Sequence, residues 1–337
     1  MNLSLLYRGP LSSCNYDCPY CPFAKRRDST AQLREDRAAL ARFVAWATAN
    51  PHGDRLSVLF TPWGEGLTRS WYWAALVTLS HLPHVDRVAI QTNLAGRLTW
   101  LADADPATLA LWATYHPGQV TRDRFLRACA TAASHGIRLS VGMVGLPEHL
   151  AEARALREAL PPETYLWINA ADGYSYDAPA EADWTQIDPL FGYSVRPHAS
   201  AGHECRAGET ALSVIGDGTV RRCHFVQTPL GNLYDGSYRR ALGPRACPKT
   251  ECDCHIGYVH LKRLDLHQIF AGGVLERIPA AWPAPTAPPH PATWGVPLRP
   301  ATGDAPTGRP VTGDAATARP ATRGTPTPVR ISARPVT

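Results

Sequence analysis

The sequence predicts an α/β protein built on an open parallel sheet, and three observations support this fold class. Six short apolar, β-rich segments occur in the first 170 residues, longer segments with helical spacing separate them, and the alternation repeats. Strand, helix and strand in repeated order give a parallel sheet with right-handed crossovers. Six units within about 190 residues are too few for a closed eight-stranded barrel, so we expect a partial (β/α)6 TIM-like barrel.

The expected elements follow one another along the first half of the chain. The strands are predicted at residues 3–7, 56–60, 87–92, 109–115, 138–144 and 165–170. The clearest helices are predicted at residues 33–49, 71–82, 122–135 and 150–160. In parallel α/β folds the chemistry gathers at the C-terminal ends of the strands, so the residues that follow each strand are the first candidates for a functional site.

The pattern changes after residue 197, which we take as the end of the first domain, residues 1–197. Residues 198–278 hold five cysteines and two segments with hairpin punctuation, IGDGTVRRCHF and PLGNLYDGS, and predict a small cysteine-rich α+β domain. Residues 279–337 are rich in Pro, Ala, Thr and Gly and contain a degenerate ten-residue repeat. Such a segment cannot bury enough apolar surface to offset chain entropy, so we expect a disordered tail.

The charge and cysteine content exclude several classes of protein. The net charge is +5, but six Arg and two Asp lie after residue 280, which leaves 28 basic and 27 acidic residues in the first 280. A nearly neutral body gives no support to a nucleic-acid partner. No apolar run reaches the roughly 18 to 20 residues that span a membrane. The N-terminus lacks a secretory signal pattern and nine cysteines is an odd number, so we expect a reducing cytoplasm and metal ligation rather than disulfides.

Three cysteines directly after the first expected strand carry the strongest functional signal. Cys14, Cys18 and Cys21 lie in the run CNYDCPYC, with CxxxCxxC spacing. A structural zinc site uses four ligands, and ferredoxins use a different spacing, so neither fits. Soft thiolates suit iron–sulfur clusters, and three of them can hold three corners of a cubane while the fourth iron stays open. The spacing predicts such a three-thiolate site.

This run, with the aromatic Tyr20 before its last cysteine, resembles the signature of the radical S-adenosylmethionine (SAM) superfamily. The resemblance implies a [4Fe–4S] cluster whose open iron is chelated by SAM, and an electron donor such as flavodoxin or ferredoxin. It further implies reductive cleavage of SAM to a 5′-deoxyadenosyl radical, which abstracts hydrogen from a substrate while the protein positions the reacting atoms. The substrate is a peptide or a small molecule.

The resemblance also places residues at later strand ends near SAM. The run LFTPWGEGL is similar to the family's Gly-Gly-Glu run, with Trp63 in place of the first glycine, and implies that Glu65 receives the amino group of SAM. For the run QTNLAG, which holds Thr92 and Asn93, the alternative to SAM contact is a turn that caps the strand. For the run VGMVGLPEH, which holds Gly145 and Glu148, the alternative is an acidic residue in the first turn of a helix. The SAM-contact candidates are Tyr20, Gly64, Glu65, Thr92, Asn93, Thr114, Gly145 and Glu148, with His116 in ATYHPG a weaker one.

The later cysteines resemble the auxiliary-cluster domains of the SPASM and twitch types. They are Cys205, Cys223, Cys247, Cys252 and Cys254. The hairpin at Asp217-Gly218 would bring the first two together, and five thiolates imply one auxiliary [4Fe–4S] cluster, with Cys247 and Cys254 preferred as the other ligands. A structural zinc site, with or without His255, is the alternative. A non-catalytic zinc-binding module with an interaction tail is the rival function. Cys129 is expected to be a small buried hydrophobe.

Overall fold

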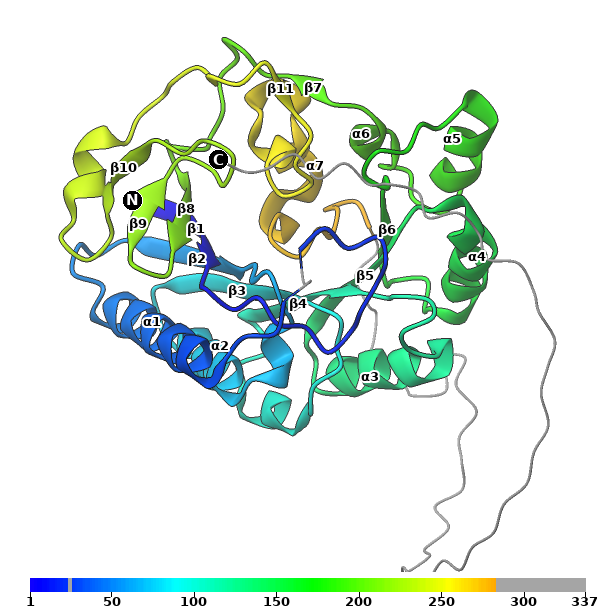
Figure 1. The fold of residues 1–337 in the computed structure, drawn as a ribbon, viewed down its shortest axis with the longest axis horizontal. Coiled ribbons are helices and arrows are strands. Elements are labelled where there is room, and N and C mark those ends of the chain that lie inside the picture. Colours follow the sequence, from blue (N-terminus) through cyan, green and yellow to red (C-terminus); the bar gives the residue numbers. More distant parts are fainter. Residues whose placement is uncertain (24–25, 283–337) are drawn as a thin grey trace, which may run out of the picture. The chain divides into compact units, whose positions relative to one another are not determined.

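A nine-stranded sheet organises the part of the chain that the computed structural model describes, residues 1–23 and 26–282 (Figure 1). These residues belong to one compact unit, Met1–Val296. The strand order is β10-β9-β8-β1-β2-β3-β4-β5-β6, and every pair from β8 to β6 is parallel. The strands of the large sheet are β1 (Asn2–Arg8), β2 (Arg55–Phe60), β3 (Val85–Thr92), β4 (Leu109–Thr114), β5 (Arg138–Val144), β6 (Leu166–Asn169), β8 (Ala211–Ile215), β9 (Thr219–Arg221) and β10 (Pro229–Asn232). A second sheet pairs β7 (His198–Ala199) with β11 (Glu251–Cys252).

Helices α1 to α4 connect the parallel strands β1 to β6, and α1, α2 and α3 lie together on one face of the sheet (Figure 1). Helix α1 begins at a capping box, in which the Ser29 side chain accepts from the backbone of Gln32 and the Gln32 side chain accepts from the backbone of Ser29. It ends at Asn50, a residue in the left-handed conformation. The helices are α1 (Thr30–Ala49), α2 (Ser70–Ser80), α3 (Arg122–Ser134), α4 (Leu150–Ala159), α5 (Ala178–Thr185), α6 (Gly192–Val195) and α7 (Leu266–Phe270).

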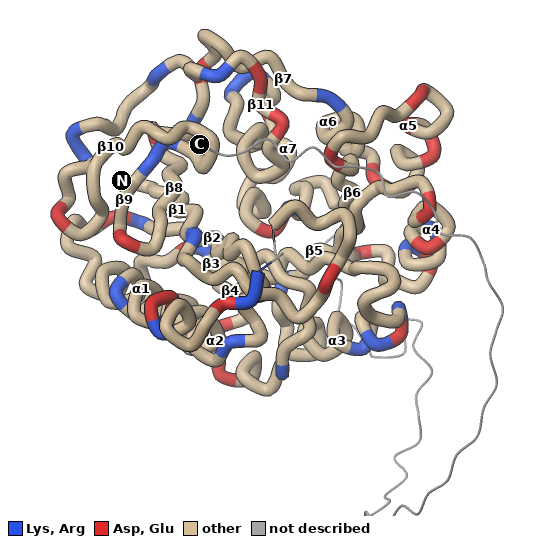
Figure 2. Tube along the Cα trace, viewed as in Figure 1, with Lys and Arg blue, Asp and Glu red and all other residues tan. Residues whose placement is uncertain are grey.

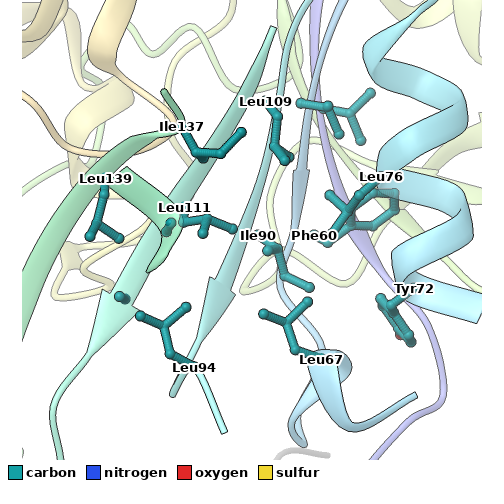
Figure 3. Close-up of a cluster of buried hydrophobic side chains, with 14 of the residues drawn as sticks. Phe60, Leu67, Tyr72, Leu76, Ile90, Leu94, Leu109, Leu111, Ile137 and Leu139 are labelled. Carbon is teal, nitrogen blue, oxygen red and sulfur yellow. The ribbon is translucent and has the colours of Figure 1, made fainter. Parts of the chain in front are cut away.

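Alternation along the strands gives the sheet two apolar faces. On β1, Leu5 and Tyr7 belong to the large core under the helices, whereas Leu6 faces the other side. Figure 3 shows part of the helix-side core, where Phe60 of β2 and Ile90 of β3 lie near the side chains of α2. Burial on both faces explains why these strands read as continuous apolar runs in the sequence.

The predicted α/β class and the order of its first ten elements are confirmed. All six expected strands are present and pair in sequential parallel order, with end shifts of one or two residues. The four expected helices are present as α1 to α4. Among the described residues no strand pairing joins β6 to β10, so the sheet is open there. Cys129 is buried in α3, as expected.

The segment that was expected to form a second domain contributes to the same sheet. Strand β8 lies parallel beside β1, with Leu212 opposite Leu5, and the β8–β9 hairpin turns at Gly218 with φ +90°. The boundary between residues 197 and 198 stays a prediction. Further along, Ile256 and Leu275 pack on the inner face of the sheet, against Leu6 and its neighbours.

The predicted tail, residues 279–337, lies outside the described residues except for its first four. Of those four, Trp282 packs against Tyr165 at a ring distance of 4.9 Å. No helix in the described part of the chain is long and apolar enough to cross a membrane. Figure 2 shows acidic and basic residues interspersed over the helices.

Candidate functional site

The three N-terminal cysteines lie in a long loop between β1 and α1, residues 9–29, which we call the cysteine loop. Two carboxylates fix its start. Asp28 Oδ2 accepts hydrogen bonds from the backbone N–H groups of Ser12 and Ser13, both at 2.8 Å, and from the Ser13 hydroxyl at 2.8 Å. Asp36, on α1, accepts from Leu11 N at 3.1 Å. Asp28 therefore ties the two ends of the loop together and holds the cysteines between them.

The structure brings these cysteines to the C-terminal edge of the sheet. Cys14 Sγ accepts from Tyr16 N at 3.4 Å and lies 3.8 Å from the Asn93 side-chain amide, at the end of β3. Burial raises the pKa of Cys14, and the charges of Glu65 and Cys21 raise it further. Cys18 is buried, with its Sγ 3.5 Å from His116 Nδ1. Because a metal or cluster binds the thiolate, these thiols would lose their protons on ligation.

The loop after β2 meets the cysteine loop through Gly64 and Glu65. Gly64 N donates to Leu11 O at 3.2 Å, and Glu65 N donates to Ser13 O at 3.1 Å. A Cβ at Gly64 would meet Ser13 O at 2.0 Å, so only glycine allows this approach of the two backbones. The close packing of the cysteine loop therefore explains why a glycine is needed at position 64.

Glu65 is a buried carboxylate at the centre of the site, with 3% of its surface exposed. Its Oε1 accepts from Leu67 N at 2.8 Å and from the Thr92 hydroxyl at 2.7 Å, and its Oε2 accepts from Asn93 N at 2.6 Å. Burial raises the pKa of Glu65, and these three bonds oppose the rise. A carboxylate offers about four acceptor positions, so one position on Oε2 stays available to a ligand.

Thr92 and Asn93 form the turn that was the alternative to a ligand-binding role. The Thr92 hydroxyl accepts from Leu94 N at 3.0 Å, and Asn93 Oδ1 accepts from Ala95 N at 2.9 Å. The Asn93 amide nevertheless faces the cysteine loop, because its Nδ2 donates to Asn15 Oδ1 at 3.0 Å as well as lying near Cys14. Strand β3 therefore holds both Glu65 and the cysteine loop in place.

The end of β4 supports the cysteine loop from the other side. His116 Nδ1 lies 3.0 Å from the Tyr20 hydroxyl, and the two rings are stacked. Gln119 Oε1 accepts from Asp17 N at 2.9 Å. Burial, with a smaller contribution from His149, lowers the pKa of His116 to about 4. The imidazole is therefore neutral at pH 7 beside Cys18.

The remaining SAM-contact candidates lie at the ends of β4 and β5. Thr114 is half-buried at the end of β4 and pairs with Gly142 of β5. Gly145 follows β5 and its carbonyl accepts from the Tyr176 hydroxyl at 2.7 Å. Glu148 is exposed, whereas its neighbour His149 is buried and packs edge-on against Tyr20 at 5.5 Å. His149 is thus the residue of this segment that contacts the cysteine loop.

The five later cysteines line one cavity, which we call the cysteine cavity. Its wall includes Cys205, Cys223, Cys247, Cys252 and Cys254, from the β8–β9 region and the segment around β11. Burial raises the pKa of Cys252 to about 12, with Cys254 the next cause. Burial also raises the pKa of Cys254, while the positive charge of Arg8 favours its thiolate. The tertiary fold therefore places all five thiols around one cavity.

The donor sets fit soft metal chemistry. Thiols are the most numerous ligand groups in both places, three in the cysteine loop and five in the cysteine cavity, and sulfur is the usual ligand atom of iron–sulfur and thiolate zinc sites. Within the described ranges, no group of three or more His, Cys, Asp or Glu side chains is placed so that it could hold a single metal ion.

Several residues that build the site gave little signal in the sequence. Asp28 and Asp36 lie in polar segments, Asp36 directly after Glu35, and their partners lie 15 to 36 residues away. Gln119 and His149 follow strands, so their positions at strand ends were a signal that could have found them. Gly142 was also missed, although a Cβ there would meet the Trp167 ring at 1.9 Å.

Comparison with known proteins gives distant structural likeness only. No family model matches the chain, and no curated protein matches it. Similar solved structures include anSMEcpe with bound AdoMet (13% identity, 72% of this chain and 80% of that one, TM-score 0.47). Others are Streptococcus suis SuiB bound to S-adenosylmethionine (14%, 71% and 64%, 0.46) and BtrN in complex with AdoMet and 2-DOIA (16%, 72% and 82%, 0.38). At these values, function has to be argued from the residues of this chain.

Proposed function

We propose that this chain is a radical SAM enzyme, in which Cys14, Cys18 and Cys21 hold a [4Fe–4S] cluster. The observation that carries the proposal is the position of the CxxxCxxC loop at the C-terminal edge of a parallel sheet, directly against the buried carboxylate of Glu65. When bound, the cluster and SAM supply a 5′-deoxyadenosyl radical that removes hydrogen from a substrate. A flavodoxin or ferredoxin is the expected electron donor.

The chain's own residues position the two ligands. The Asn93 amide and Tyr16 N–H face Cys14 Sγ, and such donors stabilise a thiolate ligand. Oε2 of Glu65 keeps one acceptor position, which suits the ammonium of an amino acid. Neutral His116 and Tyr20 cover the Cys18 side and exclude water there.

We further propose that the cysteine cavity holds one auxiliary [4Fe–4S] cluster through Cys205, Cys223 and two of the three remaining cysteines. The support is that all five thiols line one wall of the same cavity. Four thiolates would complete the ligand set and leave no iron open to SAM, so this cluster would transfer electrons or order the substrate. Cys254 is favoured over Cys252 because Arg8 lies near it and stabilises its thiolate. We also propose that the substrate is a peptide or a small molecule.

The test is anaerobic reconstitution followed by reduction with dithionite in the presence of SAM. The wild type should release 5′-deoxyadenosine and methionine, and it should bind about eight irons per chain, four for each cubane. Cys18→Ala should lose SAM cleavage. Cys129→Ala is the matched control, because Cys129 is also a buried thiol but lies in α3 among hydrophobic side chains.

Two results would contradict the proposal. SAM cleavage by Cys18→Ala at the wild-type rate would show that the N-terminal cysteines do not hold the SAM-cleaving cluster. Four irons and one zinc per wild-type chain would show that the cysteine cavity holds a structural zinc ion and not an auxiliary cluster. The double replacement of Cys205 and Cys223 by Ala should then lower the zinc content rather than the iron content.

A further inference from the structure

A second cavity lies on the inner face of the sheet, and none of the eight cysteines of the proposed cluster sites lines it. Trp112 of β4 and Trp167 of β6 form part of one wall, and Arg277 lies on the segment that covers them. We call it the Arg277 cavity. Its free volume of about 30 Å³ corresponds to roughly two water molecules. It can therefore take one small polar group rather than a whole cofactor.

Arg277 brings a buried positive charge to this cavity. Its side chain is buried, and its residue is only 6% exposed. Among the described residues the guanidinium forms no ion pair with a carboxylate. It donates hydrogen bonds to the backbone carbonyls of Val274, His255 and Ile256. It also lies over the rings of Trp112 and Phe270, at 4.7 and 5.6 Å. Buried charges are normally paired, so this arginine requires an explanation.

No neighbouring acid forms an ion pair with Arg277 among the described residues. Glu276 Oε1 pairs with Arg138 at 2.9 Å, and its Oε2 is buried without a hydrogen-bond partner. The charge of this carboxylate favours the protonated form of Arg277, but no hydrogen bond joins the two side chains. Asp188 lines the cavity, but its carboxylate accepts from the Tyr165 hydroxyl, from Ile168 N at 2.7 Å and from Leu190 N at 2.9 Å. Three of its acceptor positions are therefore filled by the chain itself. The positive charge of Arg277 is left without a direct anionic partner in the described part of the chain.

The other unsatisfied groups around the cavity are mainly donors. The indole Nε1–H groups of Trp112 and Trp167 are buried without an acceptor, and each can only donate. A guanidinium has five N–H donors, and the three bonds from Arg277 to backbone carbonyls leave some of these donors without an acceptor. The missing group should thus be a negatively charged acceptor.

We infer that the Arg277 cavity binds a carboxylate, presented by a ligand that inserts only this group. A carboxylate fits because it supplies two acceptor oxygens and a full negative charge, and it matches the planar fork of an arginine. The cavity borders the cysteine cavity along the chain, since Cys254 lines one and His255 lines the other. A ligand held there would lie beside the proposed auxiliary cluster, but the inference itself requires neither cluster nor SAM.

The experiment is a carboxylate titration of the reconstituted, oxidised protein followed by the indole ¹⁵N–¹H signals of its ten tryptophans. Acetate should shift two of these signals, assigned by Trp112→Phe and Trp167→Phe, with a roughly millimolar dissociation constant. Acetamide has the same shape without the charge and should shift them at least tenfold more weakly. N-acetylglycine tests the end of a peptide, and SAM tests the carboxylate of the cofactor.

Arg277→Gln should raise the dissociation constant for acetate roughly ten- to hundredfold, the range for one charge-assisted hydrogen bond. Arg157→Gln is the matched control, because Arg157 also donates to three backbone carbonyls but lies outside the cavity. It should leave acetate binding unchanged. The wild-type titration decides the question even if Arg277→Gln fails to fold.

The inference is wrong if acetate shifts neither indole signal, or if acetamide shifts them equally. It is also wrong if SAM shifts them at lower concentration than acetate does, because the anion would then be the carboxylate of SAM. Binding is measured without dithionite, so loss of the acetate shifts and loss of SAM cleavage are separate outcomes. The proposed function can therefore fail while the carboxylate site stands, and the reverse.

Discussion

Replacing Glu65 by Gln would separate the structural and the ligand-binding roles of this buried carboxylate. The side chain keeps its shape, but one of its two oxygens becomes an NH2 group. Whichever oxygen is replaced, the amide nitrogen faces an N–H or O–H donor, for example Asn93 N, now 2.6 Å from Oε2. Loss of one hydrogen bond to a charged acceptor costs about 1.5 to 3 kcal/mol of folding free energy. For a domain of this size we expect the melting temperature to fall by roughly 3 to 12 °C.

The same substitution should weaken SAM binding beyond its effect on stability. Three acceptor positions of the carboxylate are filled by the protein, and the fourth is available to the ammonium of SAM. Without the negative charge, the dissociation constant should rise roughly ten- to hundredfold. Anaerobic equilibrium dialysis with SAM measures this change, and iron analysis shows whether the cluster is retained.

Asp188→Asn provides the control for this experiment. Asp188 is also a buried carboxylate with three donors, namely the Tyr165 hydroxyl, Ile168 N and Leu190 N, but none of them belongs to the cysteine loop. It should lose comparable stability and keep SAM affinity within about threefold of the wild type. If both variants lose SAM affinity equally, or if Glu65→Gln loses none, Glu65 is a structural residue only.

Three further outcomes follow from the site and its surroundings. Gly64→Ala should displace the cysteine loop, at a cost of about 1 to 3 kcal/mol, and lower iron at the N-terminal site, whereas Gly272→Ala, with open space around it, should leave iron content unchanged. Burial raises the pKa of Asp188 to about 6, so the folded state binds this proton more tightly than the unfolded state and the contribution to stability falls as pH rises. Relative to Asp188→Asn, urea unfolding of the wild type should show about 1 kcal/mol less stabilisation at pH 7 than at pH 5, and no difference between the two pH values would contradict this. A chain that ends after Trp282 should melt like the full-length protein, while one that ends after residue 279 should melt lower because Trp282 packs on Tyr165; equal melting of the two would show that this contact contributes nothing.

The sequence determined those parts of the protein whose signals are local. Strands β1 to β6 and helices α1 to α4 were found because their apolar periodicity lies within single segments, and the order of the parallel strands follows from the repeated alternation. The CxxxCxxC loop was identified in the same way, since its three thiols lie within eight residues. The alternation also predicted this loop at the C-terminal edge of the sheet, where it lies.

Only the tertiary structure decided which distant residues meet. Strand β8 could pair with any free edge, and the structure places it beside β1, with Ala211 opposite Ser4, where Leu212 and Val214 join the core under the helices. The roles of Glu65 and Asp28 depend on donors that the fold brings to them from other segments. Arg277 looked like an ordinary residue before the tail. Its charge is buried, with no ion-pair partner among the described residues, because its segment packs on the inner face of β4 and β6. Such contacts depend on long-range packing and on the cost of burying polar groups, which no local pattern of residues encodes.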